Sequence, residues 1–282
     1  MEKIDAAMKK LFDGKRRIYE DEYLKDGLIY CKNCHTPRQT RYEEDEETIF
    51  PTRCKCETAR WEAEEKARQQ AEWENKVAQL RRDGIPNPSY RAYTFAADDG
   101  KTPKTTAVCK SYVENFEKLR TAGGGLILYG SVGTGKSFFA MCIANALIDK
   151  GYAVQCTSLA TVVKLAQDFD NADDHFDRLM RKPLLVIDDL GTERGTTFAQ
   201  EQIYKFIDGC YTYNIPLVIT TNYTPKLLTD AAEDTSDVTY ARIYSRILER
   251  CLPVKVNDIK RRAAKGQAYK SEMAELLGLK AE

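Results

Sequence analysis

The 282-residue sequence lacks an excess of charge of either sign, because 43 lysines and arginines balance 43 aspartates and glutamates. Its net charge therefore gives no indication of a nucleic-acid partner, although a local basic patch is compatible with it. The sequence has no run of about 18 apolar residues, so we expect no membrane span. Its first residues lack the apolar segment of a secretory signal. We expect a cytoplasmic protein, in whose reducing environment clustered cysteines bind metal more often than they form disulfides.

Four of the nine cysteines lie close together, as a C-x2-C pair at Cys31 and Cys34 and a C-x-C pair at Cys54 and Cys56. Thiolates bind Zn²⁺ tetrahedrally, and C-x2-C is the usual turn that donates two of them. We predict a structural zinc site, since four protein ligands leave no open position for a substrate. The segment between the pairs suits a hairpin with the tip YEEDEE. There are two alternatives: His35 replaces one of the thiolates, or the four cysteines are merely buried or reactive.

A second pattern, GSVGTGKS at residues 130–137, matches G-x-x-x-x-G-K-[ST] between a predicted strand and a predicted helix. Its glycines allow successive backbone N–H groups to face phosphates, and the helix N-terminus adds partial positive charge. Lys136 is expected to reach the β- and γ-phosphates of ATP, and the Ser137 hydroxyl to bind Mg²⁺. The predicted nucleotide-binding residues of this loop are Gly130, Ser131, Val132, Gly133, Thr134, Gly135, Lys136, Ser137 and Phe138.

The apolar segment LLVIDDLG at residues 184–191 predicts a strand that ends in two acids. Asp188 would hold the Mg²⁺, and Asp189 would polarise the attacking water. Many related ATPases have glutamate at the second position, and aspartate is one methylene shorter. Glu193 is therefore an alternative candidate for the role of Asp189. A second alternative is that the chain binds ATP without hydrolysing it. The two acids could instead cap the next helix.

Polar and basic side chains further along the chain complete a predicted catalytic set. Asn222 ends the predicted strand PLVITTN and would orient the hydrolytic water, unless it only forms a turn. Arg242, Arg246 and Arg250 follow at i, i+4 and i+8, on one helix face. They are either a solvated face or a source of an arginine that reaches the γ-phosphate of a neighbouring subunit.

Strand-like and helix-like segments alternate after residue 105, which predicts an α/β fold with a parallel sheet covered on both faces. Strands are expected at GGLILYG, YAVQCTS, PLLVIDDL, IPLVITTN and LPVKV. The helices between them include single helices over 106–122 and 159–181. Residues 1–28 are also expected to be helical. Residues 57–83 contain neither glycine nor proline and predict a long charged helix, which is either solvated or a partner-binding or self-associating surface.

GSVGTGKSFFA, LLVIDDLGTER, VITTN and RIYSRILE, taken together over residues 85–265, resemble the AAA+ ATPases of the DnaC/DnaI type. These are replicative helicase loaders, and the IstB transposition helpers are close relatives. The segment CKNC…CKCE and the charged helix after it resemble phage and Firmicutes loaders that have a zinc-binding front domain. IstB-like proteins generally lack this front domain, so the resemblance favours a loader.

The resemblance implies an ASCE-type sheet in the order 5-1-4-3-2, with the strand before the phosphate-binding loop as strand 1, and a reduced lid. Asn222 would be sensor 1. Arg246 would be the arginine finger, with Arg242 as the second candidate. The sensor-2 arginine would be Arg261 or Arg262. We therefore expect a helix and zinc-binding domain at 1–56, a charged linker helix at 57–84, and an ATPase domain with a short lid at 85–282.

The partners implied by the resemblance are a DnaB-type replicative helicase hexamer, single-stranded DNA and further copies of the chain, assembled in an ATP-dependent way. The helicase would be bound through the zinc domain. Residues 159–181 occupy the place where loaders contact DNA, and they contain Lys164, Arg178 and Arg181 beside several acids. A transposition helper that forms ATP-dependent filaments on duplex DNA is the alternative function, and a zinc adaptor that binds ATP without hydrolysis is a further one.

Overall fold

The computed structural model describes residues 17–42, 45–191, 195–257, 259, 261–277 and 279. The chain divides into two compact units, Met1–Asn75 and Lys76–Glu282. The division falls inside helix α2 (Lys55–Gly84), whereas the sequence suggests a separate linker over 57–84. In the described part of the chain, no helix is both long and apolar enough to cross a bilayer.

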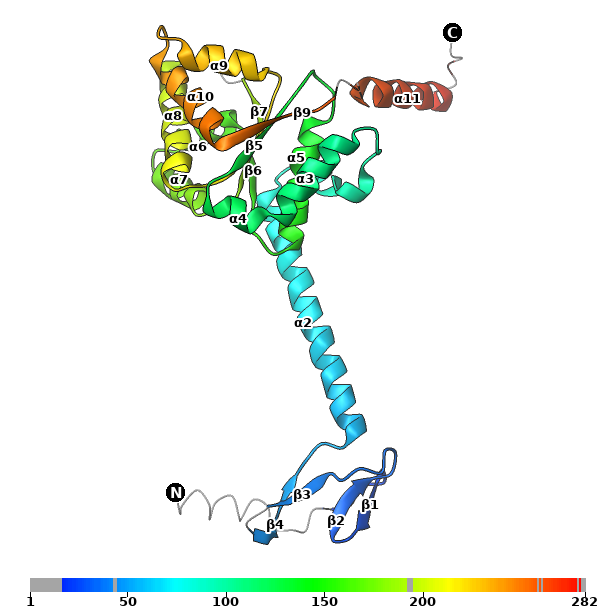
Figure 1. Ribbon diagram of the computed structural model, residues 1–282. Coiled ribbons are helices and arrows are strands. Elements are labelled where there is room, and N and C mark those ends of the chain that lie inside the picture. The colour runs from blue at the N-terminus through cyan, green and yellow to red at the C-terminus, as the bar shows by residue number, and fades with distance from the viewer. Residues whose placement is uncertain are drawn as a thin grey trace. The chain divides into compact units, whose positions relative to one another are not determined.

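The strands of the first unit form two antiparallel hairpins (Figure 1). β1 (Glu22–Lys25) pairs with β2 (Leu28–Cys31), and β3 (Gln39–Tyr42) pairs with β4 (Asp45–Pro51). The second of these is the hairpin predicted between the two cysteine pairs. The first hairpin turns through Asp26 and Gly27, whose φ angles of 52° and 75° suit a two-residue hairpin turn.

The helix predicted over residues 1–28 is wrong where the structure describes it, because β1 and the start of β2 lie within that range. The Asp-Gly pair at 26–27 is a strong hairpin signal, and cross-strand pairing of Tyr23 with Tyr30 prevails over the apolar spacing upstream. Residues 1–16 of the predicted helix lie outside the described residues.

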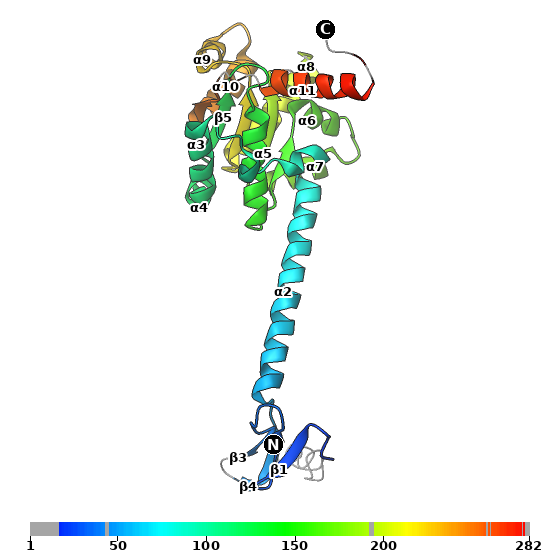
Figure 2. The same ribbon diagram turned by 90° about the vertical axis from the view of Figure 1, so that its right-hand side faces the viewer.

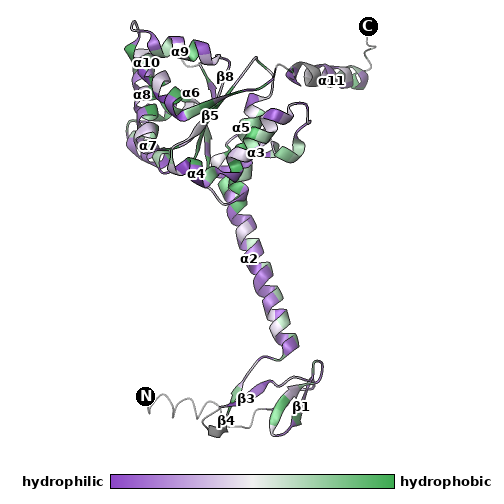
Figure 3. Cartoon of the chain, in the orientation of Figure 1, coloured by the Kyte–Doolittle hydropathy of each residue, from purple (hydrophilic) through white to green (hydrophobic). Residues whose placement is uncertain are grey.

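Helix α2 leaves most of its side chains exposed, and its surface is largely hydrophilic (Figure 3). Its buried residues are Val77 and Gly84, both in the second unit. Arg81 donates from Nε to Asn145 Oδ1 at 3.1 Å. A Cβ atom on Gly84 would lie 2.1 Å from the backbone oxygen of Val154. The last turns of the helix are therefore part of the packing of the second unit.

A five-stranded parallel sheet forms the centre of the second unit, in the order β6-β7-β8-β5-β9. The strands are β5 (Gly125–Tyr129), β6 (Gln155–Thr157), β7 (Leu185–Leu190), β8 (Leu217–Thr221) and β9 (Cys251–Lys255). When the strands are numbered from β5, this is the order 5-1-4-3-2, so the predicted topology is confirmed. The three inner strands β7, β8 and β5 are short and mostly apolar, as is typical of parallel strands buried on both faces.

Helices cover both faces of this sheet (Figure 1, and Figure 2 for the face that α3 and α5 cover). The helices of the unit are α3 (Pro103–Glu114), α4 (Phe116–Thr121), α5 (Lys136–Asp149), α6 (Leu159–Ala166), α7 (Ala172–Met180), α8 (Thr197–Thr212), α9 (Pro225–Glu233), α10 (Val238–Arg250) and α11 (Arg261–Leu276), with short 3-10 turns at η1 (Pro88–Ala92) and η2 (Phe95–Ala97). Successive strand residues face opposite sides. Leu126 and Leu128 pack with α3 and α5, whereas Ile127 packs with α6, α8 and α10.

Two helices that the sequence predicts as continuous are interrupted, and α9 is not predicted at all. Asn115 separates α3 from α4, and its side-chain Nδ2 donates to the Ser111 backbone oxygen at 2.9 Å. Residues 167–171 separate α6 from α7, and there Asn171 Nδ2 donates to the Asp168 carboxylate at 3.2 Å. Short polar side chains compete with helical backbone hydrogen bonds in this way, which apolar periodicity does not register.

Replacing Phe206 by alanine should destabilise the second unit strongly. Phe206 on α8 is completely buried, so its loss leaves a cavity and should cost about 3–5 kcal/mol of unfolding free energy. The measurement is the shift in urea midpoint. Tyr213→Ala is the control, because Tyr213 directly follows α8 and is 64% exposed. An equal loss in both variants would contradict the packing described.

Candidate functional site

A glycine-rich loop connects strand β5, which lies between β8 and β9, to helix α5, and its conformation depends on glycine. Gly130, Gly133 and Gly135 have φ angles of 150°, 82° and 103°, which side chains with a Cβ adopt only with strain. A Cβ on Gly130 would also lie 2.6 Å from the backbone oxygen of Val256. The loop ends where α5 begins at Lys136, so the helix N-terminus faces the concavity of the loop.

The side chain of Lys136 lies inside this loop and is 8% exposed. Its Nζ donates to the backbone oxygens of Gly130 (3.0 Å) and Ser131 (2.9 Å), and to Asn222 Oδ1 at 2.8 Å. Burial lowers the pKa of Lys136, and the negative charge of Asp189 opposes this effect. The structure thus brings together Lys136 and Asn222, which the sequence predicts as parts of one site although 86 positions separate them.

Oxygen atoms from three elements meet beside Lys136. Ser137 Oγ donates to Asp188 Oδ1 at 2.7 Å, and Thr220 Oγ1 donates to the same carboxylate oxygen at 2.6 Å. Asp189 is exposed and has a φ angle of 66°. Hydroxyl and carboxylate oxygens are the ligands that Mg²⁺ prefers, usually together with substrate phosphates. The donor set of Ser137 and Asp188 therefore fits a magnesium ion.

A pocket of about 290 Å³ adjoins the loop. Aromatic rings form part of its wall: the centroids of Tyr90 and Tyr93 are 5.3 Å apart, and those of Tyr93 and Phe138 are 5.4 Å apart. Burial raises the pKa of Tyr90, and the nearby charge of Asp188 raises it further. Of these rings, the sequence predicts only Phe138 as a site residue. Tyr90 and Tyr93 fall inside the predicted ATPase domain at 85–282, but the sequence does not single them out as site residues.

Both candidate sensor-2 arginines line this pocket, but they make different contacts. Arg261 forms two hydrogen bonds with the Asp99 carboxylate, at 2.8 and 2.7 Å, and donates to the Thr134 backbone oxygen at 2.6 Å. Arg262 donates its backbone N–H to the Gly133 oxygen at 3.3 Å, and its side chain is exposed. Arg261 therefore joins the loop to the segment before α3, whereas the side chain of Arg262 is available at the pocket.

The family model described as IstB-like ATP binding protein matches residues 63–268, well over half of the chain. The chain belongs to the IstB-like ATP-binding protein family. The replicative helicase loader DnaI of Bacillus subtilis (strain 168) is 26% identical over 180 residues, which are 60% of this chain and 58% of that protein. The match thus spans less than two thirds of the length of this relative.

Solved structures of two helicase loaders have the same fold as this IstB-like chain. A crystal structure of DnaI has a TM-score of 0.53 at 20% identity, covering 64% of this chain and 95% of its own. A crystal structure of the DnaC helicase loader has a TM-score of 0.53 at 23% identity, covering 61% and 100%. At these identities the likeness establishes the AAA+-type architecture and nothing finer.

The three arginines of α10 are outside the lining of the pocket beside the loop. Arg246 pairs with Asp208 Oδ1 at 2.6 Å and lies over the ring of Tyr204, with 4.9 Å to its centroid. Arg250 donates to the Ala122 backbone oxygen at 3.0 Å. Arg242 is exposed.

Glu193, the alternative to Asp189, lies outside the described residues.

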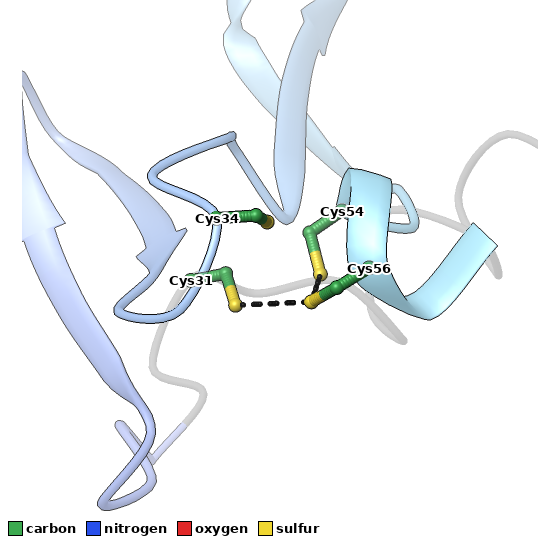
Figure 4. A group of neighbouring side chains, drawn as sticks. All are labelled: Cys31, Cys34, Cys54 and Cys56. Atoms are coloured by element: carbon green, nitrogen blue, oxygen red, sulfur yellow. Dashed lines mark hydrogen bonds between the residues drawn. The ribbon is translucent and has the colours of Figure 1, made fainter. Parts of the chain in front are cut away.

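The four N-terminal cysteines, which precede the residues matched by the family model, form one cluster (Figure 4). Their sulfur atoms all lie within 4.8 Å of one another. Sulfur atoms around a tetrahedral zinc ion are about 3.8 Å apart, so the cluster fits this ion. His35 is outside the group, and its Nδ1 lies 3.4 Å from the Tyr23 hydroxyl. A hydrogen bond with the Thr36 hydroxyl lowers the pKa of Cys34 to about 5.

A partly buried arginine lies next to the cysteine cluster. Arg38 donates from Nη1 to Glu22 Oε1 and from Nη2 to Asp21 Oδ2, both at 2.8 Å. Its Nη2 also lies 3.8 Å from the sulfur of Cys31. A guanidinium in this place offsets negative charge on thiolates, and the fully buried Glu22 side chain holds it there.

From the ion pair between Asp99 and Arg261 we predict how the Asp99 carboxyl group titrates. Hydrogen bonds from Arg261 lower the pKa of Asp99 from 3.8 to about 2. In ¹³C NMR, the Asp99 carboxyl should therefore stay ionised down to pH 3 in the wild-type protein. Arg261→Gln should bring its midpoint close to 3.8, because the carboxylate loses its partner.

Arg262→Gln is the matched control, since it leaves the contacts of Asp99 intact. A low pKa of Asp99 in the Arg261→Gln variant would mean that another group stabilises the carboxylate.

Proposed function

We propose that this chain binds and hydrolyses ATP at the loop between β5 and α5. The proposal is supported by one observation above all: Lys136 and Ser137, at the start of α5, directly contact Asn222, which follows β8, and Asp188 on β7. This is the arrangement that phosphoryl transfer needs, in which cations and oriented donors surround the phosphates. The phosphates would lie against the backbone N–H groups of residues 130–137, with the base toward Tyr93 and Phe138.

In this proposal each side chain has one role. Lys136 turns from its present acceptors to the β- and γ-phosphates, and Ser137 and Asp188 hold Mg²⁺, which neutralises phosphate charge when it is bound. Asp189 polarises the attacking water and Asn222 orients it.

The positive charges around the phosphates come from two places. Arg261 or Arg262 serves as sensor 2. Arg246 is the arginine that a neighbouring copy contributes, and to do so it must leave Asp208. Arg242 is the second candidate and is already exposed.

We propose further that the chain is a helicase loader in DNA replication, which binds a DnaB-type hexamer through its cysteine domain and helps to place it on single-stranded DNA. The sequence relation to the DnaI loader of Bacillus subtilis supports this role, as do the cysteine cluster and the charged helix α2 that precede the ATP-binding unit. Residues 159–181 are the proposed DNA contact, although Arg178 is engaged there with His175.

A second function has support from the family model, whose description names IstB-like proteins. A transposition helper would form ATP-dependent filaments on duplex DNA and would need no helicase. The cysteine cluster favours the loader, because it lies before the residues that the family model matches.

ATP hydrolysis should depend on Lys136. Lys136→Ala should lower the steady-state rate by at least about 100-fold, because the developing phosphate charge loses its cation. Lys118→Ala, at an exposed position on α4, is the control and should hydrolyse ATP normally. Absence of turnover in the wild-type chain, with ATP still bound, would instead favour an ATP-binding adaptor.

The cysteine cluster should hold one zinc ion per chain and be required for helicase capture. The double variant Cys54→Ser and Cys56→Ser should lose the zinc, because two thiolate ligands are gone, and should keep ATP binding. In a pull-down with the replicative helicase of the host, wild-type protein should be retained and the variant should not.

Cys109→Ser is the control, since that cysteine is buried in the other unit. Zinc-free wild-type protein would refute the metal site. Filaments on duplex DNA without helicase binding would favour the transposition helper over the loader.

A further inference from the structure

The hydroxyl of Thr220 connects both acidic residues of the proposed ATPase site. It donates to Asp188 Oδ1 at 2.6 Å and accepts from the backbone N–H of Asp189 at 2.8 Å. Thr220 is on β8 and only 1% exposed, so water does not compete for these bonds. Thr220 is absent from the residues that the sequence singles out, because nothing in the string VITTN distinguishes one threonine from the other.

The first bond fixes the direction of the Asp188 carboxylate. Ser137 Oγ also donates to Oδ1, at 2.7 Å, so this oxygen is held from both sides, by α5 and by β8. A carboxylate that is held in this way keeps one orientation before any cation arrives. Groups that hydrogen-bond a metal ligand tune affinity by fixing the ligand's orientation in this manner.

The second bond fixes the backbone of Asp189. This residue has a φ angle of 66°, in the left-handed region that disfavours side chains with a Cβ. The pairing of β7 with β8 is interrupted between Ile187 and Leu190, so the backbone N–H of Asp189 is outside the regular ladder. The Thr220 hydroxyl accepts a hydrogen bond from this N–H and thereby stabilises the irregular part of β7 that exposes the Asp189 carboxylate.

A hydroxyl is suited to this double role, because one oxygen atom can donate one hydrogen bond and accept another. Valine has nearly the same shape but can do neither. Thr221, the next residue, uses its hydroxyl differently and donates to the Leu190 backbone oxygen at 2.9 Å. The two adjacent buried threonines therefore make a matched pair for experiment.

We propose that Thr220 is the positioning residue for both carboxylates of the ATP site, setting Asp188 for Mg²⁺ and Asp189 for the attacking water. This inference rests on the proposed ATPase function and adds a residue to it. Thr220 touches neither nucleotide nor metal in this role and acts through its two neighbours on β7.

The test is a Mg²⁺ titration of full-length Thr220→Val, read by binding of a fluorescent ATP analogue and by hydrolysis. The half-saturating Mg²⁺ concentration should rise by about 10- to 100-fold, the range that loss of such a supporting bond produces. Binding of the analogue in EDTA should equal that of the wild type, because the loop itself is unchanged. Hydrolysis at saturating Mg²⁺ should stay about tenfold lower, since Asp189 is no longer held.

Two variants separate positioning from mere stability. Thr220→Ser retains the hydroxyl and should restore the Mg²⁺ dependence, whereas Thr221→Val should lower thermal stability without changing that dependence. If Thr220→Val does not fold, Thr220→Ala is used in its place, because it introduces no methyl group beside the carboxylate.

The outcomes separate the two proposals. An unchanged Mg²⁺ titration in the Thr220 variant, with wild-type protein that binds and hydrolyses Mg²⁺-ATP, would overturn the role of Thr220 alone. An equal shift in Thr220→Val and Thr221→Val would also overturn it. Failure of the wild-type protein to bind Mg²⁺-ATP would overturn the proposed ATPase function together with this inference.

Discussion

The parallel hydrogen-bond ladder that joins β7, β8 and β5 is the constraint on which the candidate site depends. It sets Tyr129 opposite Thr221, and Ile187 opposite Ile219, so the carboxyl ends of the three strands meet at one edge of the sheet. The loop follows β5 and Asn222 follows β8, while the two acids lie near the end of β7. Because side chains alternate along a strand, a shift of one residue in this register would point every one of these groups to the opposite face.

The first unit depends on a different kind of interaction. Its buried residues in the described part of the chain are Glu22, Ile29, Cys31 and Cys54, which is too small a set for an apolar core. The cysteine cluster and the ion pair of Arg38 with the buried Glu22 take the place of such a core. A metal ion that binds only the folded form would supply the missing stabilisation.

Much of the second unit is predictable from its sequence. The apolar runs for β5, β7 and β8 are short and end in motif residues, so their type and their order can be inferred. Hydrogen bonds of short polar side chains are harder to infer from the sequence. Those of Asn115 and of the Asp168–Asn171 segment lie where helices that the sequence predicts as continuous are divided. The roles of the α10 arginines are also hidden in the sequence. Their equal spacing places the three arginines on one helix face. In the structure, however, Arg246 and Arg250 have partners in the second unit, whereas Arg242 is exposed.

The sequence by itself determined the residues of the candidate phosphate-binding loop, because such a loop needs glycines, one lysine and one hydroxyl at fixed spacing. It also determined that four cysteines would act together. Only the tertiary structure decided which contacts these residues make: that Lys136 meets Asn222, that Arg261 holds Asp99, and that Thr220 joins both acids. The physical reason is that such contacts depend on strand register and on backbone angles such as the φ of Asp189, and distant parts of the chain set these jointly.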